Sequence, residues 1–195
     1  MGNLYVGLLH HPMRNRQGEI VTTSMTSMDV HDIARTARTY DVLQYYIITP
    51  HQSQREIARR IKGYWTEAEG RAENTNRGEA LELVLVLDKL ESSIEDIMDR
   101  EDREPLVVGT SARDLSVDTV SYSSLRRSLQ NSSRPVYLLF GTGWGIADEL
   151  LDRFDCILEP VRGIGDFNHL SVRAAVAIIL DRVRGASPAV SSEES

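Results

Sequence analysis

Short apolar runs alternate with amphipathic segments along most of this chain. Six apolar runs predict strands over Leu4–His11, Tyr45–Thr49, Leu81–Leu87, Leu106–Val108, Val136–Phe140 and Cys156–Leu158. Apolar residues three to four positions apart predict helices over Met28–Val42, Gln54–Trp65, Glu91–Asp102, Tyr122–Leu129, Ile146–Phe154 and Leu170–Val183. This alternation predicts an α/β fold with a mostly parallel sheet flanked by helices.

Polar segments suggest where the ordered domain is interrupted and where it ends. The stretch Gly70–Gly78 predicts a loop, and Ala186–Ser195, which is rich in Ser, Pro and Glu, predicts a disordered tail. We therefore expect one domain over residues 1–185 and a tail over 186–195. Asp29 and Asn168 are the predicted N-caps of the first and last helices.

Charge and cysteine content narrow the functional class. The formal net charge is −7, which is unlike a globally basic nucleic-acid binder, so RNA binding would need a local basic patch or a second protein. The single cysteine, Cys156, cannot form an intrachain disulfide, and we expect a cytoplasmic protein. No signal peptide or apolar run of ~20 residues is visible in the sequence, so no membrane is expected. His10-His11-Pro12 has no third ligand at metal-site spacing, so no metal is expected.

Three predicted strands end in residues typical of a ligand site. They are followed by Thr110-Ser111, by Gly141–Gly145 and by Glu159–Gly165. Open α/β sheets bind ligands beyond the carboxyl ends of their strands, so one interpretation is a nucleotide-like ligand held by main-chain groups. Ordinary tight turns are the alternative, and three such ends together favour a site. The GTGWG loop matches neither the dinucleotide fingerprint nor a Walker loop.

Several segments together resemble one known superfamily. They are Leu8–Pro12, Thr22–Ser24, Asp29–Tyr40, Thr110–Arg113, Phe140–Gly145 and Asn168–Arg173. In combination they resemble the SPOUT superfamily of RNA methyltransferases, and more narrowly a small bacterial family without an appended RNA-binding domain. The resemblance covers about residues 4–185. It implies a C-terminal deep trefoil knot, a feature that sequence patterns alone would not suggest.

The resemblance also implies a cofactor, S-adenosylmethionine, bound within the knot. One wall of its pocket would be Leu139, Gly141, Thr142, Gly143 and Gly145. A second wall would be Leu158, Pro160, Val161 and Gly163, and a third Asn168, Leu170 and Ser171, with Thr110 and Ser111 nearby. Glycine allows the close backbone approach that such a pocket needs.

Residues for methyl transfer are less well defined by the sequence. Asp32, Arg35 and Arg38 fall near one face of a predicted helix. They either face RNA, with arginines on phosphate and a carboxylate or histidine as base, or form ion pairs on a capped helix. The resemblance favours the first interpretation, and we predict Arg38, Asp32, His169 and Arg173 as the catalytic set. Arg173 lies in an apolar helix, so its charge must be paired or face an interface.

The last predicted helix, Leu170–Val183, is apolar almost all round, which is typical of a helix that a partner covers. SPOUT proteins dimerise through the knot region, so the resemblance also implies a homodimer. We therefore predict an S-adenosylmethionine-dependent methyltransferase acting on tRNA or rRNA. The alternative is a non-catalytic SPOUT-like dimer that binds cofactor or RNA as a partner subunit. The target nucleotide and atom, the base, and any second protein stay open.

Overall fold

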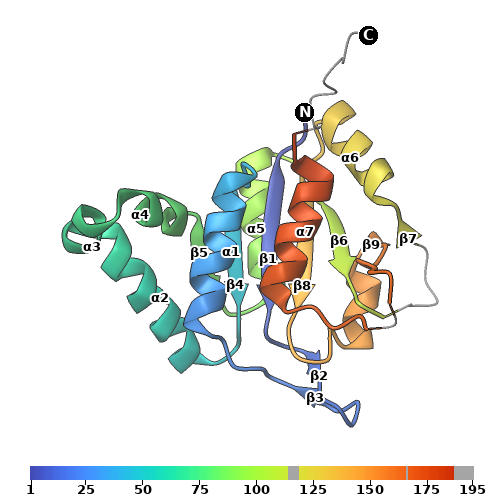
Figure 1. The fold of residues 1–195 in the computed structure, drawn as a ribbon, viewed down its shortest axis with the longest axis horizontal. Helices are drawn as coiled ribbons and strands as arrows, with labels where there is room; N and C mark the ends of the chain where they lie inside the picture. Colours follow the sequence, from blue (N-terminus) through green and yellow to red (C-terminus); the bar gives the residue numbers. More distant parts are fainter. Residues whose placement is uncertain (114–118, 166, 187–195) are drawn as a thin grey trace.

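The computed structural model describes residues 1–113, 119–165 and 167–186, and the side chains of 68 and 69 are not described. A seven-stranded sheet forms its centre, and every strand pair in it is parallel. The spatial order is β5 (Val84–Leu87), β4 (Gln44–Ile48), β1 (Leu4–Leu9), β8 (Val136–Gly141), β6 (Leu106–Thr110), β9 (Cys156–Leu158) and β7 (Thr119–Val120) (Figure 1). The predicted parallel α/β fold is confirmed, and among the strands of this sheet only the two-residue β7 was not foreseen.

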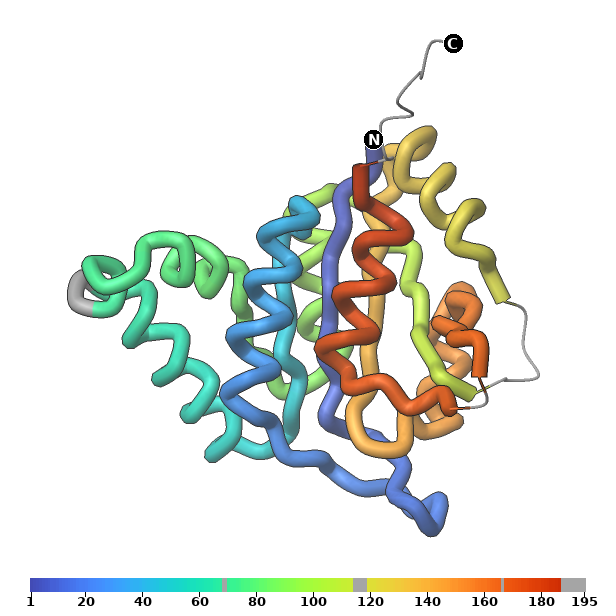
Figure 2. The backbone as a smooth tube through the Cα atoms, viewed as in Figure 1, coloured from blue at the N-terminus to red at the C-terminus, as the bar shows by residue number. Residues whose placement is uncertain are grey.

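Helices cover both faces of the sheet and build two apolar cores. One core joins the sheet to α1 (Ser27–Thr39), α6 (Tyr122–Asn131) and α7 (Val172–Arg184). The other joins the opposite face to α5 (Leu90–Glu101) and to the last residues before β9, near the 3₁₀ helix η1 (Asp148–Arg153). The end of α7 returns to the N-terminus, where Arg184 Nη1 donates to the Gly2 carbonyl at 3.1 Å (Figure 2).

An arm of three helices extends from the β5 edge of the sheet. It comprises α2 (Gln52–Thr66), α3 (Ala68–Glu73) and α4 (Thr75–Glu82) (Figure 1). The predicted loop Gly70–Gly78 is therefore wrong, and the predicted strand at 81–87 begins only at Val84. The reason is packing on Trp65: the Arg77 guanidinium lies 4.5 Å from its ring centroid, and a Cβ on Gly78 would stand 2.8 Å from its carbonyl. A polar run is thus helical where it packs against Trp65 of the preceding helix α2.

Two basic residues of α2 donate hydrogen bonds to the carbonyls of the edge strand β5. Lys62 Nζ donates to the Val84 carbonyl at 2.6 Å, and Arg59 Nη2 donates to that of Val86 at 3.2 Å. Burial lowers the pKa of Lys62. An uncovered edge strand would offer these carbonyls to another chain, so the two side chains protect β5 from pairing.

A small hairpin lies beyond the carboxyl end of β1. Its strands, β2 (Met13–Arg14) and β3 (Ile20–Val21), are antiparallel and were not predicted. Met13 also forms a β-bridge with Ile146, so the predicted α-helix Ile146–Phe154 is wrong: only residues 148–153 turn, as a 3₁₀ helix. The predicted tail lies outside the described residues except for residue 186.

No helix in the described ranges combines the length and apolarity that a membrane crossing needs.

Candidate functional site

The three strand ends singled out in the sequence meet at one edge of the sheet. β8, β6 and β9 are neighbours, with Leu139 opposite Gly109 and Thr110 opposite Leu158. Adjacent strands lie ~4.8 Å apart, so the loops that follow them share one small region. Asn168 Nδ2 donates to the Ala112 carbonyl at 2.9 Å and ties the segment before α7 to the end of β6. The expected convergence is confirmed.

The loop after β8, residues 142–147, is bound to the hairpin. Arg14 N donates to the Gly145 carbonyl at 2.9 Å, and Trp144 N donates to that of Arg14 at 3.2 Å. Gly143 and Gly145 have φ of 60° and 99°, a region that favours glycine. A Cβ on Gly141 would lie 2.6 Å from Ile146 Cγ1. Much of the glycine content here is therefore required by the loop's own turns and packing.

Between β9 and α7, the described residues 159–165 and 167–171 are more open. No described atom lies within 4 Å of where a Cβ would stand on Gly163 or Gly165. Ile164, Phe167 and Leu170 are exposed, Phe167 by 79%. Free space beside main chain, in a segment that also exposes apolar side chains, leaves room for a mostly apolar ligand recognised by backbone groups.

The residues expected to line the cofactor pocket differ in exposure. Leu139 and Leu158 are fully buried in different cores, so they can offer only main-chain groups. The half-buried members are Thr110, Ser111, Gly141, Thr142, Gly145, Pro160, Val161 and Asn168, and the exposed members are Gly143, Gly163, Leu170 and Ser171. Thr110 Oγ1 donates to the Leu139 carbonyl at 2.9 Å. Hydrogen bonds thus join the end of β6 to β8 through Thr110 and Leu139, and the segment before α7 to Ala112 through Asn168.

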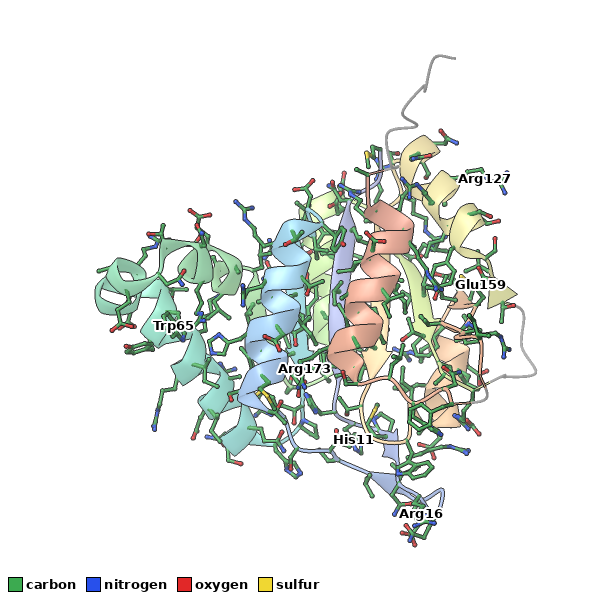
Figure 3. The ribbon with its side chains drawn as sticks, in the orientation of Figure 1. His11, Arg16, Trp65, Arg127, Glu159 and Arg173 are labelled. Carbon is green, nitrogen blue, oxygen red and sulfur yellow. The ribbon has the colours of Figure 1, made fainter. Side chains whose placement is uncertain are left out.

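The N-termini of α1 and α7 lie side by side near these loops (Figure 3). Thr26 caps α1 and Asp29 completes a capping box, while Ser171 caps α7. The predicted N-caps Asp29 and Asn168 are therefore wrong by three residues each. In both cases a hydroxyl at the helix start accepts the backbone N–H bond, which leaves Asp29 and Asn168 free for tertiary contacts.

Arg173 is paired, as its apolar surroundings required. Its Nη1 lies 3.1 Å from Asp29 Oδ1, and its Nε lies 3.4 Å from Asp32 Oδ2. The Asp29 side chain is 8% exposed, that of Arg173 28% and that of Asp32 51%. The guanidinium therefore joins α7 to α1 and balances a buried carboxylate.

The structure does not bring the four predicted catalytic residues together within one chain. Asp32 and Arg173 are in contact, but Arg38 lies nine residues beyond Asp29, or ~14 Å along α1, toward the opposite end of the sheet. Arg38 Nη2 lies 3.9 Å from Glu79 of α4. The ion pairs of this helix therefore reach other helices, unlike the i,i+3 pairs of the alternative interpretation.

An aromatic group borders the glycine loop. The His169 ring is exposed, and its centroid lies 5.3 Å from that of Phe167 and 6.5 Å from that of Trp144. His11 and Arg16 lie toward the same carboxyl edge (Figure 3). These side chains form a solvent-facing rim beside the three loops.

The sequence favoured His10 and His11 as strand-end histidines near the cleft, and His10 stands directly after β1. Its side chain is fully buried, and Nδ1 lies 3.1 Å from Thr23 Oγ1. Burial lowers the pKa of His10 to about 4, against a smaller opposing effect of Asp29. The burial of His10 could have been predicted, because side chains alternate between the two faces of the sheet along β1 and His10 is the next position on the face of Leu8.

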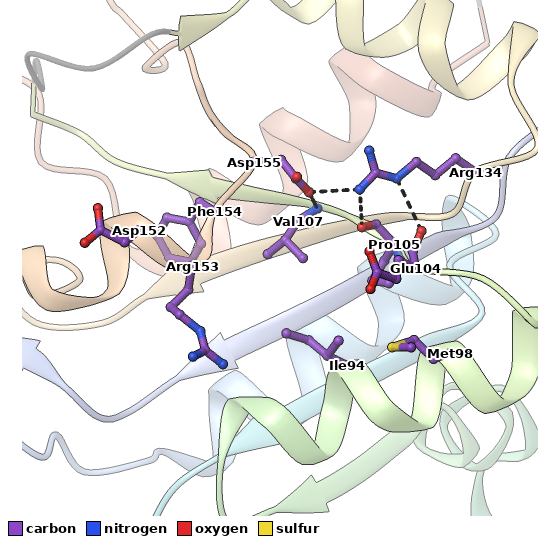
Figure 4. Close-up of a pocket in the computed structure, with 10 residues that line it drawn as sticks. All are labelled: Ile94, Met98, Glu104, Pro105, Val107, Arg134, Asp152, Arg153, Phe154 and Asp155. Carbon is purple, nitrogen blue, oxygen red and sulfur yellow. Dashed lines mark hydrogen bonds and ion pairs between the residues drawn. The ribbon is translucent and has the colours of Figure 1, made fainter.

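An open hollow elsewhere on the protein is a weaker site. It lies near α5 and the start of β6, lined by Ile94, Met98, Glu104, Pro105, Val107, Arg134, Asp152, Arg153, Phe154 and Asp155 (Figure 4). Arg134 Nη2 donates to the Pro105 carbonyl at 2.8 Å and lies 3.2 Å from Asp155 Oδ2. Asp155 also accepts from Val107 N at 2.8 Å. Because these polar groups already have protein partners, the hollow offers little to a ligand.

No group of three potential metal-ligating side chains occurs within the described ranges.

Comparison with known proteins identifies the family. Residues 3–185 match the sequence model of a family described as SAM-dependent RNA methyltransferase. The chain belongs to this family. That membership confirms the predicted class of enzyme and its cofactor, S-adenosylmethionine. An uncharacterized protein of Aquifex aeolicus is 49% identical over 181 residues, covering 93% of this chain and 88% of that protein.

A relative with a functional name is longer. The tRNA (guanine-N(1)-)-methyltransferase of Oleidesulfovibrio alaskensis is 44% identical over 183 residues, which is 94% of this chain and only 42% of that protein. Among solved structures, the SpoU methyltransferase AviRb of Streptomyces viridochromogenes, in complex with AdoMet, has a TM-score of 0.56 at 13% identity. The aligned region covers 93% of this chain and 56% of the AviRb chain. This likeness supports the SPOUT methyltransferase fold.

Proposed function

We propose that this protein transfers a methyl group from S-adenosylmethionine to tRNA in the cytoplasm, as a homodimer. The observation that carries the proposal is the convergence of three backbone-rich loops at one sheet edge, in a chain of this family. The name of the longer relative favours tRNA, and a guanine, as the target. Ribosomal RNA is the other outcome of the assay below.

The cofactor would lie against main chain of the three loops. Gly163 supplies open space, Leu170 supplies apolar contact, and Leu139 and Leu158 supply backbone groups. The remaining members of this proposed site are Thr110, Ser111, Gly141, Thr142, Gly143, Gly145, Pro160, Val161, Asn168 and Ser171. The chemistry supplied by the cofactor is a methyl group on a positively charged sulfur. The protein's part is to orient that group toward RNA and to exclude water.

We further propose that the chain forms a trefoil knot here. In the sheet, β9 lies next to β6 on the side away from β8. After β9 the chain passes back to α7, which packs against β8 and α1. On this route the segment before α7 would cross the chain just after β6, at the level of Ala112. The Asn168–Ala112 hydrogen bond joins the two crossing segments.

The proposed dimer interface includes the exposed side of α7. Val176, Ile179 and Leu180 are buried in the core, whereas Ala177 and Ile178 are only half-buried. Leu170 and Met28 add exposed apolar surface beside it. A second copy covering this surface could also bring its own Arg38 toward the site. His169, on the exposed rim, is placed to contact RNA, and Arg173 holds Asp29 and Asp32 in position.

Calorimetry and a transfer assay test this proposal. Wild-type protein should bind S-adenosylmethionine and transfer tritiated methyl groups to total RNA from a strain lacking the protein, with nucleoside mass spectrometry identifying the product. Absence of cofactor binding would overturn the proposal. Binding without transfer would instead support the non-catalytic partner subunit.

A substitution in open space tests the location of the cofactor. Gly163→Val adds a side chain where no described atom lies within 4 Å, so stability should stay unchanged while cofactor affinity falls at least tenfold. Gly63→Val in α2 is the matched control, because its Cβ would meet only the flexible Glu67 side chain at 3.5 Å. Equal affinities in both variants would remove Gly163 from the site.

A further inference from the structure

His10 lies beneath the proposed cofactor site without contacting solvent. Successive side chains along a strand point to opposite faces of the sheet. Leu8 lies in the core beneath α1 and α7, and Leu9 lies in the core on the opposite face. His10 therefore continues on the α1 and α7 side of the sheet. Its Nε2 is buried and has no hydrogen-bond partner among the described residues. A buried imidazole with one engaged nitrogen requires an explanation.

The engaged nitrogen belongs to a chain of hydrogen bonds that ends in the glycine loop. Thr142 Oγ1 donates to the Leu9 carbonyl at 3.2 Å, so its oxygen is left to accept from Thr23 Oγ1, which it contacts. Thr23 Oγ1 in turn accepts from His10 Nδ1 at 3.1 Å. A competing bond from Thr23 Oγ1 to the His10 carbonyl is longer, at 3.4 Å.

These directions assign the histidine tautomer. His10 carries its proton on Nδ1, and Nε2 has a bare lone pair. Burial lowers the pKa of His10 to about 4, so the ring is neutral at physiological pH. The hydrogen bonds therefore run from His10 to Thr23 and from Thr23 to Thr142. Thr142 is also held by its hydroxyl on the Leu9 carbonyl and by its backbone N–H, which lies 3.3 Å from the Met13 sulfur, a weak acceptor.

We propose that His10 is a positioning residue which, through Thr23, fixes Thr142 and thereby the conformation of the glycine loop that binds the cofactor. This inference rests on the proposed function of that loop. It links a buried strand-end side chain to the site without any direct contact to ligand or RNA. Thr23 is the obligatory intermediate, since its hydroxyl both accepts from His10 and donates to Thr142.

Substitutions at His10 separate hydrogen bonding from packing. The amide nitrogen of asparagine stands as far along the side chain as Nδ1, so His10→Asn keeps the donor to Thr23, whereas His10→Gln places its amide near Nε2 and loses it. We expect S-adenosylmethionine affinity to fall about tenfold, or ~1.4 kcal/mol, in His10→Gln and to stay within about twofold of wild type in His10→Asn.

The intermediate residue gives a second test with a matched control. Thr23→Val should weaken cofactor binding as much as His10→Gln, and the double variant no more than either one, because all three break the same chain. Thr22→Val removes the neighbouring hydroxyl, which contacts His11 Nδ1 at 3.0 Å outside this chain, and should leave affinity unchanged.

Amide hydrogen exchange in the protein alone separates this inference from the proposed function. Exchange at residues 143–147 should be about tenfold faster in His10→Gln and Thr23→Val than in wild type and Thr22→Val. Unchanged exchange would overturn the positioning role, as would faster exchange with unchanged cofactor affinity. A wild-type protein that binds no cofactor would instead overturn the proposed function, and with it this role.

Discussion

Loss of the Arg173 guanidinium should destabilise the protein, because the buried Asp29 carboxylate would lose its cation. Breaking a fully buried ion pair costs about 3–5 kcal/mol, and breaking an exposed one about 0–1 kcal/mol. The Arg173 side chain is 28% exposed, and Asp29 keeps its bonds from Thr26. We therefore expect Arg173→Met to lower the free energy of unfolding by about 2 kcal/mol.

Urea unfolding at fixed protein concentration, followed by circular dichroism, measures this loss. Arg38→Met is the matched control: its ion pair with Glu79 spans 3.9 Å between side chains that are 56% and 46% exposed, and its loss should cost less than about 0.5 kcal/mol.

Charge and capping can be separated in a double variant. Arg173→Met with Asp29→Asn should recover more than half of the loss, because asparagine removes the buried charge and keeps an oxygen for Thr26. Equal losses in Arg173→Met and Arg38→Met, or no recovery in the double variant, would refute the reasoning.

Two further predictions concern pH and packing. The pKa of His10 falls from 6.5 to about 4 on folding, so unfolding takes up a proton between these values. Stability should therefore be lost as pH falls from 6.5 toward 4, by up to ~1.4 kcal/mol per pH unit. His10→Asn should reduce that slope in pH-dependent urea titrations. The contribution of His31, whose pKa burial also lowers, should remain. An unchanged slope would contradict the burial effect. Gly141→Ala should lower the melting temperature by an overpacking cost of about 1–3 kcal/mol, because its Cβ would stand 2.6 Å from Ile146 Cγ1. Gly163→Ala is its control, and equal melting temperatures would show that the loop accommodates the methyl group.

Local patterns located the strands well and some loops badly. The run Val136–Phe140 became β8 with one added residue, because a strand buried on both faces is apolar along its whole length. The loop predicted over Gly70–Gly78 was wrong, since the contacts that favour its helices come from Trp65 of α2, outside the polar run. Both predicted helix caps failed for a related reason: several polar residues near a helix start can cap it, and tertiary contacts decide which one does.

For the candidate site, too, the sequence determined some features and the tertiary structure decided the others. The sequence determined that strand ends rich in glycine and small polar residues would meet at one edge, because parallel strands share their carboxyl ends. Only the tertiary structure decided that Gly141 and Gly143 pack against protein while Gly163 faces open space. It also decided that Arg173 pairs with Asp29 and that Arg38 pairs with Glu79 of α4. The Arg173–Asp29 pair joins residues 144 positions apart, and no local pattern of polarity encodes which distant residues will touch.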